Sequence, residues 1–268
     1  MGRIDLRILM KKIKIGIFGP KGRMGESILE QIKNFSELKL SSLCENKKHS
    51  IVGKELAGIL VHSDLKKLVN ESDVIIDFTI PEATINLLEE LRKSKKKTAV
   101  VTGTTGFTKS QEKKFLKLCK GLKILQSFNM SLGINILKEL VKKTAKIISE
   151  ESDIEISEIH HNMKRDVPSG TALTLADSVN EGVKVKKKNS YRLHSTNLLR
   201  KKNEIGFSSV RGGDVVGEHS VYFFMDGERI ELTHRAVDRK IFSNGALKAA
   251  TWIFNKKPGM YSLIDMLG

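Results

Sequence analysis

The stretch that decides the fold is IKIGIFGPKGRMG, from Ile13 to Gly25. It begins with a short apolar run, IKIGIF, which is typical of a strand buried in a sheet. Glycines follow at Gly19, Gly22 and Gly25, and apolar residues recur at helical spacing from Met24 to Ile32. The pattern therefore predicts a strand, a glycine turn and a helix, in that order.

A glycine turn in this place lets the backbone approach a pyrophosphate, and the helix N-terminus supplies N–H donors. The spacing is G-x-x-G-x-x-G, whereas the usual motif is G-x-G-x-x-G, so a purely structural turn is the alternative. A second predicted strand, Leu40 to Cys44, ends at Glu45, which lies 20 residues after Gly25. An acid there suits the ribose hydroxyls of an adenine dinucleotide, and Asn46 with the two following lysines could instead meet a 2′-phosphate. The two signals together predict a dinucleotide site for NADH or NADPH.

Strands and helices continue to alternate along the first half of the chain. Further strands are predicted at Val74 to Phe78, Thr98 to Thr102 and Leu122 to Gln126, with helical patterns between and after them. This order indicates an α/β fold with a doubly wound parallel sheet, whose ligands bind outside the carboxyl ends of the strands. The residues predicted at those ends are Phe78, Thr79, Gly103, Thr104, Thr105, Ser127, Phe128, Asn129 and Met130.

The pattern changes after Ser131. A long helix is predicted to about Glu151, and strands then dominate, including two runs joined by the hairpin signal Asp226-Gly227. A final helix is expected from about Asn244 to Asn255, packed back on the first domain. We therefore predict a dinucleotide-binding domain of residues 1–131 and 241–268. Residues 132–240 are predicted to form an inserted α+β domain built on a mixed sheet.

The stretch EIHHNMKRDVPSGT, Glu158 to Thr171, carries the chemistry. Two histidines and Lys164 are followed by Pro-Ser-Gly-Thr, which looks like a turn that leads into a helix N-terminus. Such groups can hold an anion and give it a proton. Alternation along the strand places His160 and His161 on opposite faces and leaves open which one faces a ligand. The alternative interpretation is that both are structural histidines with satisfied hydrogen bonds.

Composition limits the other possibilities. The net charge of +16 comes from lysines that are spread along the chain without interleaved aromatic residues, so we expect no nucleic-acid groove but a field that favours anionic ligands. No apolar run reaches the ~18 residues of a membrane span, and no signal peptide is recognised, so a cytoplasmic protein without membrane contact is expected. Met10 is a second candidate for the start of translation.

Cysteine chemistry and metal binding are also disfavoured. Cys44 and Cys119 do not have C-x-x-C spacing, and we expect them to be buried small hydrophobic residues. Adjacent histidines diverge on a strand, and no third ligand stands at a suitable spacing, so no zinc site is predicted.

Several motifs in order make the chain resemble the 4-hydroxy-tetrahydrodipicolinate reductase family of lysine and diaminopimelate biosynthesis. The motifs are GPKGRMG, DFTIPEAT, VTGTTGF, FNMSLGIN, EIHHNMKRDVPSGTAL, RGGDVVGEH and ELTHRAVDR. The resemblance implies a Rossmann-like domain formed by both chain ends and an inserted substrate domain whose sheet builds a homotetramer. It implies that the enzyme reduces a cyclic imine dicarboxylate, 4-hydroxy-tetrahydrodipicolinate, to tetrahydrodipicolinate with NADH or NADPH and with loss of water.

The resemblance also implies roles for residues. The pyrophosphate would lie on Gly19, Pro20, Lys21, Gly22, Arg23 and Met24, and Glu45, followed by Asn46, would hold the adenosine ribose. Phe78, Gly103, Thr104, Thr105, Ser127, Phe128, Asn129 and Met130 would complete the cofactor site toward the nicotinamide. His160 would be the proton donor and Lys164 the second acid or substrate cation. His161, Ser169, Gly170 and Thr171 would bind the substrate carboxylates.

Two departures from the family and two competing functions remain. No glycine stands between Tyr191 and Ile205, where relatives have a glycine-bearing loop, and Asn46 takes the place of an arginine found in some members. The first alternative function is another nicotinamide-dependent two-domain dehydrogenase of amino-acid metabolism. The second is a non-catalytic protein that binds a dinucleotide or nucleic acid.

Overall fold

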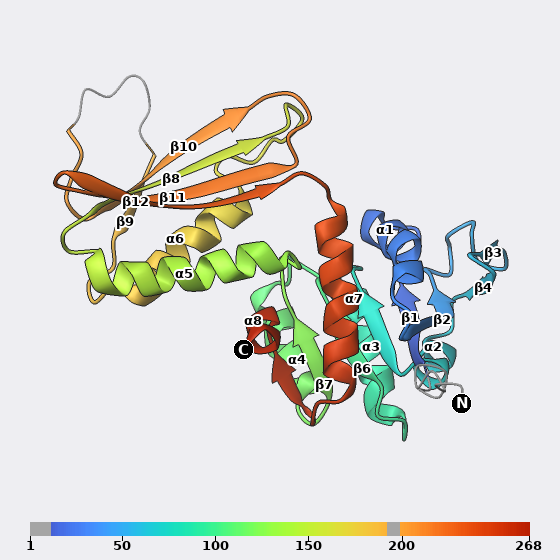
Figure 1. Cartoon of the computed structure of the whole chain (residues 1–268). Helices are drawn as coiled ribbons and strands as arrows, with labels where there is room; N and C mark the ends of the chain where they lie inside the picture. The colour runs from blue at the N-terminus through green and yellow to red at the C-terminus, as the bar shows by residue number, and fades with distance from the viewer. Residues whose placement is uncertain (1–11, 192–198) are drawn as a thin grey trace, which may run out of the picture. The chain divides into compact units, whose positions relative to one another are not determined.

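The computed structural model describes residues 12–191 and 199–268, which belong to two compact units (Figure 1). The first unit extends to Met130 and resumes at Lys240–Gly268, and the second is Ser131–Arg239. Met10 and most of the glycine-free loop after Tyr191 lie outside the described residues. No helix in the described ranges has the length and apolar character needed to span a membrane.

The first unit is built on an eight-stranded sheet in the order β13-β7-β6-β5-β1-β2-β4-β3. All neighbouring strands pair in parallel except β3 and β4. The strands are β1 (Ile13–Phe18), β2 (Leu38–Cys44), β3 (Glu55–Leu56), β4 (Ile59–His62), β5 (Val74–Asp77), β6 (Ala99–Thr102), β7 (Lys123–Gln126) and β13 (Gly259–Tyr261). The predicted α/β class is confirmed, and the three strands that were not predicted are short edge strands without a clear apolar period.

Helices cover both faces of this sheet. Residues of α2, α3 and α4 share one apolar core with the sheet, while α1 pairs with α7 (Figure 1). The helices are α1 (Arg23–Gln31), the single 3-10 turn η2 (Ile32–Asn34), α2 (Leu65–Glu71), α3 (Pro81–Lys93), α4 (Lys109–Cys119), α7 (Lys240–Phe254) and α8 (Leu263–Leu267). The last long helix begins four residues earlier than predicted and packs on the first unit as expected. Cys44 and Cys119 are both buried and free, which confirms their expected role as packing residues.

The glycine turn has the predicted form. Gly19 has φ +79°, a conformation that residues with a Cβ rarely adopt. Gly22 is the N-cap of α1, and a Cβ on Gly25 would lie 2.3 Å from the carbonyl oxygen of Gly19. The first turn of α1 can therefore pack this closely on the loop only with glycine at that position.

The second unit is built on a five-stranded mixed sheet in the order β12-β11-β8-β10-β9. Its strands are β8 (Asp153–His160), β9 (Lys188–Ser190), β10 (Glu204–Arg211), β11 (Gly217–Met225) and β12 (Glu228–Ala236). Strand β8 pairs in parallel with β10 and antiparallel with β11, and Gly227 turns the predicted β11–β12 hairpin with φ +77°. Helices α5 (Leu132–Ile148) and α6 (Gly170–Gly182) share an apolar core with one face of the sheet (Figure 1).

Candidate active site

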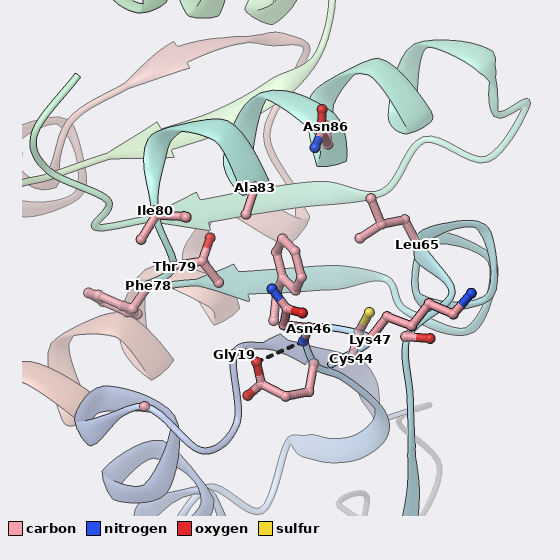
Figure 2. Close-up of a pocket in the computed structure, with 14 residues that line it drawn as sticks. Gly19, Cys44, Asn46, Lys47, Leu65, Phe78, Thr79, Ile80, Ala83 and Asn86 are labelled. Carbon is pink, nitrogen blue, oxygen red and sulfur yellow. Dashed lines mark hydrogen bonds between the residues drawn. The ribbon is translucent and has the colours of Figure 1, made fainter. Parts of the chain in front are cut away.

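A pocket of about 490 Å³ opens at the carboxyl ends of β1, β2 and β5 in the first unit. Five predicted cofactor residues line it, namely Gly19, Gly22, Glu45, Asn46 and Phe78, and Cys44, Lys47, Ser63, Leu65, Thr79, Ile80, Ala83 and Asn86 are among the others (Figure 2). The remaining predicted cofactor residues, Pro20, Lys21, Arg23, Met24, Gly103, Thr104, Thr105, Ser127, Phe128, Asn129 and Met130, do not line this pocket. The pocket is therefore lined by more of the residues expected at the adenosine and pyrophosphate than of those expected at the nicotinamide.

Glu45 joins the second strand to the glycine turn. Its carboxylate accepts a hydrogen bond from the backbone N–H of Asn46 at 2.8 Å, drawn in Figure 2, and one from the backbone N–H of Lys21 at 3.3 Å. The side chain of Glu45 is half-buried at the pocket wall. It is therefore oriented by backbone donors while one edge of the carboxylate stays available to a ligand hydroxyl.

Asp77 joins the segments at the ends of β5 and β6 in the first unit to the helix α3. One carboxylate oxygen accepts from the backbone N–H and the hydroxyl of Thr79, at 3.0 and 2.6 Å. The other accepts from the hydroxyls of Thr84 at 2.6 Å, Thr102 at 3.1 Å and Thr104 at 3.4 Å. Burial raises the pKa of Asp77, although these hydrogen bonds oppose the shift. Sequence reasoning missed Asp77, because its only signal is an acid at the end of an apolar strand.

The residues predicted near the nicotinamide differ in exposure. Gly103 lies against Phe78, where a Cβ would come within 2.1 Å of the Phe78 ring. Phe128 is 65% exposed, whereas Met130 is buried with its carbonyl oxygen against Gly245. The Ser127 hydroxyl donates to the carbonyl oxygen of Asn129 at 2.7 Å, which shapes this loop. Phe128 is thus free to cover a bound ligand, while Met130 contributes to the core.

The second unit holds a polar cluster around Glu158, which is 1% exposed. Strand register explains the cluster, because Ser209 of β10 and His219 of β11 stand opposite Glu158 of β8 on its two sides. The Glu158 carboxylate accepts from the Ser209 hydroxyl at 2.8 Å and from the Arg211 guanidinium at 2.8 Å. It also accepts from the backbone N–H of Ser169 at 3.1 Å.

These donors decide the charge of Glu158. Burial alone would raise the pKa of the Glu158 carboxyl, but the bonds from Ser169, Arg211 and Ser209 outweigh burial and hold the pKa below its usual value. Arg211 also donates to the backbone oxygen of Asp166 at 2.7 Å, so the same guanidinium joins Glu158 to the loop after β8. Glu158 is therefore a buried carboxylate that stays ionised.

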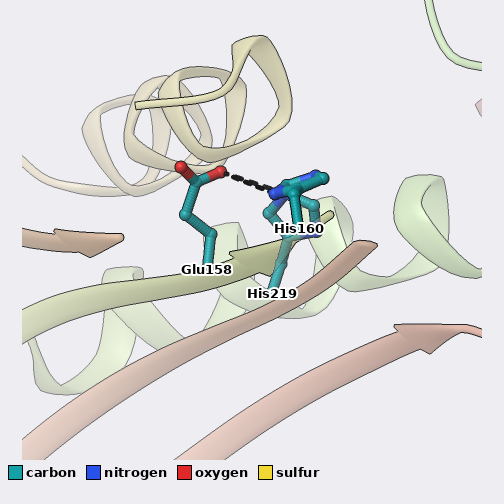
Figure 3. A group of neighbouring side chains, drawn as sticks. All are labelled: Glu158, His160 and His219. Atoms are coloured by element: carbon teal, nitrogen blue, oxygen red, sulfur yellow. Dashed lines mark ion pairs between the residues drawn. The ribbon is translucent and has the colours of Figure 1, made fainter. Parts of the chain in front are cut away.

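His160 is the histidine that enters this cluster (Figure 3). Its Nδ1 lies 3.3 Å from a Glu158 oxygen, and its ring meets the His219 ring edge to face with centroids 4.9 Å apart. Burial lowers the pKa of His160, and Lys164 and Arg211 act in the same direction, while Glu158 and Asp166 oppose the shift. His161 lies just beyond the strand, half-buried, with its backbone N–H bonded to the carbonyl oxygen of Val215. Alternation left the choice between the histidines open, and the fold buries His160 beside the carboxylate.

The loop after His161 carries the remaining predicted residues. The Lys164 ammonium contacts both oxygens of Asp166 at 2.8 Å, and the hydrogen bond from Lys164 lowers the pKa of Asp166. Ser169 is the N-cap of α6, as its hydroxyl accepts from the Ala172 N–H at 3.2 Å and lies 3.1 Å from His219 Nε2. Gly170 and Thr171 form the first turn of α6. The predicted helix N-terminus therefore lies beside the histidine cluster.

Sequence reasoning missed Glu158 and His219 and left Arg211 unassigned. Alternation places Glu158 on the same face as His160, and the motif RGGDVVGEH contains both Arg211 and His219, which were the available signals. The argument that no third metal ligand exists was wrong in its geometry, because the fold brings a donor atom of His219 within 4.8 Å of donors on Glu158 and His160. Arg211 and the nearby Lys164 disfavour a divalent cation there by charge repulsion, so we assign no metal.

Comparisons with known proteins point in one direction. Residues 13–130 match the family described as dihydrodipicolinate reductase, N-terminus, and residues 133–267 match dihydrodipicolinate reductase, C-terminus. The chain is 43% identical over 263 residues to the 4-hydroxy-tetrahydrodipicolinate reductase of Pelagibacter ubique, covering 96% of this chain and 99% of that one. It is 39% identical over 267 residues to the corresponding reductase of Geotalea daltonii, with the same coverage.

Solved structures agree on the fold. A dipicolinate-bound dihydrodipicolinate reductase from Paenisporosarcina sp. TG-14 superposes with a TM-score of 0.78 at 22% identity, covering 94% of this chain and 98% of that one. The myo-inositol dehydrogenase of Lactobacillus casei, solved with NAD(H) and myo-inositol, gives a TM-score of 0.60 at 14% identity, covering 95% and 90% of the two chains.

Proposed function

The chain belongs to the dihydrodipicolinate reductase family, and we propose that it carries out the reductase reaction with His160 as proton donor and the α6 N-terminus as substrate clamp. The activity is that of a 4-hydroxy-tetrahydrodipicolinate reductase of lysine and diaminopimelate biosynthesis, an oxidoreductase that uses NADH or NADPH. The residue roles below are our assignment, and the buried contact of His160 with the Glu158 carboxylate carries it. We propose the cytoplasm as its place of action.

The first unit is proposed to bind the dinucleotide. The close packing of Gly25 on Gly19 leaves a turn with no side chain in the way of a pyrophosphate, and the α1 N-terminus begins there. Glu45 is oriented for ribose hydroxyls, with Asn46 beside it. The bound nicotinamide supplies the hydride. The residues that would approach it are Phe78, Gly103, Thr104, Thr105, Ser127, Phe128 and Asn129.

The second unit is proposed to hold the substrate, a cyclic imine with two carboxylates. Lys164 and the N–H groups of the first turn of α6, at Gly170 and Thr171, suit one carboxylate, and His161 and the Ser169 hydroxyl suit the other. Asp166 holds Lys164 in the free protein, and a substrate carboxylate would replace that contact. The remaining field near the site is cationic, from Lys164 and Arg211.

Proton supply follows from the same geometry. The reaction loses the C4 hydroxyl as water, adds hydride to the conjugated ring and leaves an electron pair shared between ring carbon and nitrogen. One proton must meet that pair to complete tetrahydrodipicolinate, and a histidine titrates close enough to neutral pH to give it. His160 is the histidine that a neighbouring carboxylate supports as a cation.

The test is a double variant, His160→Gln with Lys164→Ala. The substrate is supplied as the fresh product of a coupled aldolase, and the rate of NADH or NADPH oxidation is measured. We expect this rate to fall by roughly 10³-fold, because general acid catalysis alone contributes 10²–10⁴-fold. Cofactor affinity, measured by fluorescence titration, stays within about twofold, since both residues belong to the second unit. Wild-type turnover retained in the double variant would contradict the assignment. Lys142→Ala, which breaks an exposed ion pair with Glu181, is the matched control.

We also propose that the open face of the second sheet forms a homotetramer. Helices α5 and α6 cover one face, and the other presents Ile159, Val210, Tyr222 and Phe224. Val210, opposite Ile159, is 53% exposed and Phe224, opposite Asp153, is 39% exposed, so apolar side chains are exposed at both ends of this face. Light scattering should give four chains for the wild type and smaller particles for Val210→Glu with Phe224→Glu. A monomeric wild type would exclude this assembly.

A further inference from the structure

We propose that Glu158 is a positioning residue of the reaction, which holds the Nδ1–H of His160 and thereby presents Nε2 as the nitrogen that gives the proton. This inference rests on the proposed role of His160 as proton donor. It concerns how the imidazole is oriented and kept charged, and it assigns to Glu158 a part in catalysis through another residue.

The two ring nitrogens of His160 have different surroundings. Glu158 Oε2 lies 3.3 Å from His160 Nδ1 in an ion-pair contact, and the buried Nδ1 makes no hydrogen bond with any described residue (Figure 3). The opposite nitrogen, Nε2, lies at Gly217, where a Cβ would come within 3.0 Å of it. A glycine in that place leaves Nε2 uncovered on its Gly217 side. The nearby carboxylate therefore favours a proton on Nδ1, which leaves Nε2 to exchange a proton with a ligand.

Glu158 can do this only if it stays a carboxylate, and three donors keep it so. Strand β10 supplies the Arg211 guanidinium and the Ser209 hydroxyl, each at 2.8 Å, and the turn before α6 supplies the Ser169 N–H. Both oxygens are already oriented before any ligand arrives. The carboxylate is thus built into the sheet and does not depend on a mobile partner.

The charged and titratable groups that face His160 come from four places. Glu158 stands on β8, Lys164 and Asp166 on the loop that follows, Arg211 on β10 and His219 on β11. Burial and the two cations disfavour the imidazolium, and Glu158 is the largest opposing influence. Removing its charge while keeping its shape should therefore make His160 a poorer proton carrier at neutral pH.

His219 completes the arrangement without adding charge. Burial and the neighbouring His160 lower the pKa of His219 to about 4, so it is neutral when the enzyme works. Its Nε2 lies beside the Ser169 hydroxyl, and its ring packs edge-on against His160. His219 therefore limits the rotation of the His160 ring, and it links the proton site to the N-cap of α6.

A purely structural role is the competing explanation, because Glu158 also anchors Ser169 and Arg211. The two roles differ in their pH dependence. We would measure kcat against pH for wild type, Glu158→Gln and Glu158→Asp, with Glu181→Gln, which changes an exposed acid paired with Lys142, as control. For each variant, the KM for substrate and the cofactor Kd would be measured as well.

The proposal predicts that Glu158→Gln moves the alkaline limb of kcat to lower pH by about one unit or more, because the imidazolium loses its counter-charge. At pH 8 kcat should fall roughly 10-fold or more and recover in part at lower pH, with cofactor Kd within about twofold. Glu158→Asp retains the charge, so its alkaline limb should stay within about half a unit of wild type. Equal loss at every pH, with the limb unmoved, would overturn the proposal.

Gly217→Ala tests the orientation even if Glu158→Gln does not fold. Its Cβ would crowd Nε2, so kcat should fall about 10-fold with cofactor affinity unchanged. Unchanged kcat in Gly217→Ala would show that Nε2 is not the reacting nitrogen. His160→Gln separates this inference from the proposed function. If His160→Gln turns over normally, the proposed role of His160 itself is wrong. If His160→Gln loses turnover but the kcat–pH profile of Glu158→Gln is unshifted, only the role of Glu158 is wrong.

Discussion

Each unit of the molecule buries one carboxylate beside its candidate site, and the two carboxylates behave oppositely. Asp77 in the first unit is fully buried and accepts from threonine hydroxyls and a backbone N–H, and burial raises its pKa. Glu158 in the second unit is equally buried, but Arg211 and the other donors hold its pKa low. The difference shows that donors which include a guanidinium outweigh the effect of burial on the pKa of Glu158, whereas the neutral donors around Asp77 do not outweigh it.

This contrast fits what each site has to do. Neutral hydrogen bonds around Asp77 fix the shape of strand-end loops that we propose to meet the cofactor. The second site needs charge, because a dicarboxylate must be held and a proton must be moved. The comparison leads to four predictions, from the largest expected effect to the smallest.

Arg211→Ala should be the most damaging substitution in the second unit. It leaves the buried Glu158 carboxylate without its cation and cuts the link to the Asp166 backbone, which should lower the free energy of unfolding by about 3 kcal/mol. Urea denaturation measures this. The control is Arg229→Ala, which removes an exposed pair with Glu231 and should cost less than about 1 kcal/mol. Equal costs for the two arginines would contradict the account of Glu158.

Gly25→Ala should weaken the cofactor site by a steric route. The new Cβ would stand 2.3 Å from the carbonyl oxygen of Gly19, so the glycine turn or α1 must shift. We expect the Kd for NADH to rise roughly 10-fold or more, since a displacement of the donors lowers binding steeply. Binding of pyridine-2,6-dicarboxylate alone should not change. An unaltered Kd for NADH would show that the turn does not hold the dinucleotide.

The pH dependence of stability should have opposite signs for the two acids. The pKa of Glu158 is lower in the folded than in the unfolded protein, so its ionisation stabilises the fold above about pH 4, and this stability is lost as pH falls through the folded pKa. The free energy of unfolding of the wild type should therefore rise relative to that of Glu158→Gln from pH 3 to pH 7. The raised pKa of Asp77 means that its ionisation opposes folding. The free energy of unfolding of Asp77→Asn should therefore rise relative to that of the wild type as pH rises over the same range. Chemical denaturation at several pH values tests both, and slopes of equal sign would break the comparison.

Thr84→Val should give the smallest effect. The hydroxyl of Thr84 donates to Asp77 at 2.6 Å inside a buried network, and its replacement by a methyl group of similar size should cost about 1 kcal/mol. The cost should be smaller in an Asp77→Asn background, because the amide presents a weaker acceptor or a donor to that position. A double-mutant cycle measures the coupling, and zero coupling would mean that the bond contributes nothing.

Much of the first unit could be predicted from the sequence. Its central strands are apolar runs, its glycine turn has a local steric cause, and the capping box of α4 has its whole signal in Thr108 and Gln111, three residues apart. The edge strands β3, β4 and β13 could not, since two to four residues show no period. Asp77 was not recognised because nothing local in the sequence shows that the hydroxyls of four threonines will converge on it.

The second site could be predicted only in its local part. His160, Lys164 and the Ser169 N-cap lie within one short stretch of sequence. Glu158 acquires its surroundings from strand pairing, where β10 brings Ser209 and β11 brings His219 to its two sides. One sequence does not reveal which strands will pair or in which register, so the partners of Glu158 could not be recognised.

The most direct measurement of the central claim is a crystal structure with oxidised or reduced cofactor and pyridine-2,6-dicarboxylate bound together. The account predicts the pyrophosphate at the Gly19 to Gly25 turn, and the two carboxylates against Lys164 and the stretch from Ser169 to Thr171, with the ring facing Nε2 of His160. Carboxylates bound away from Lys164 and Ser169, or a ring that faces His161, would contradict it.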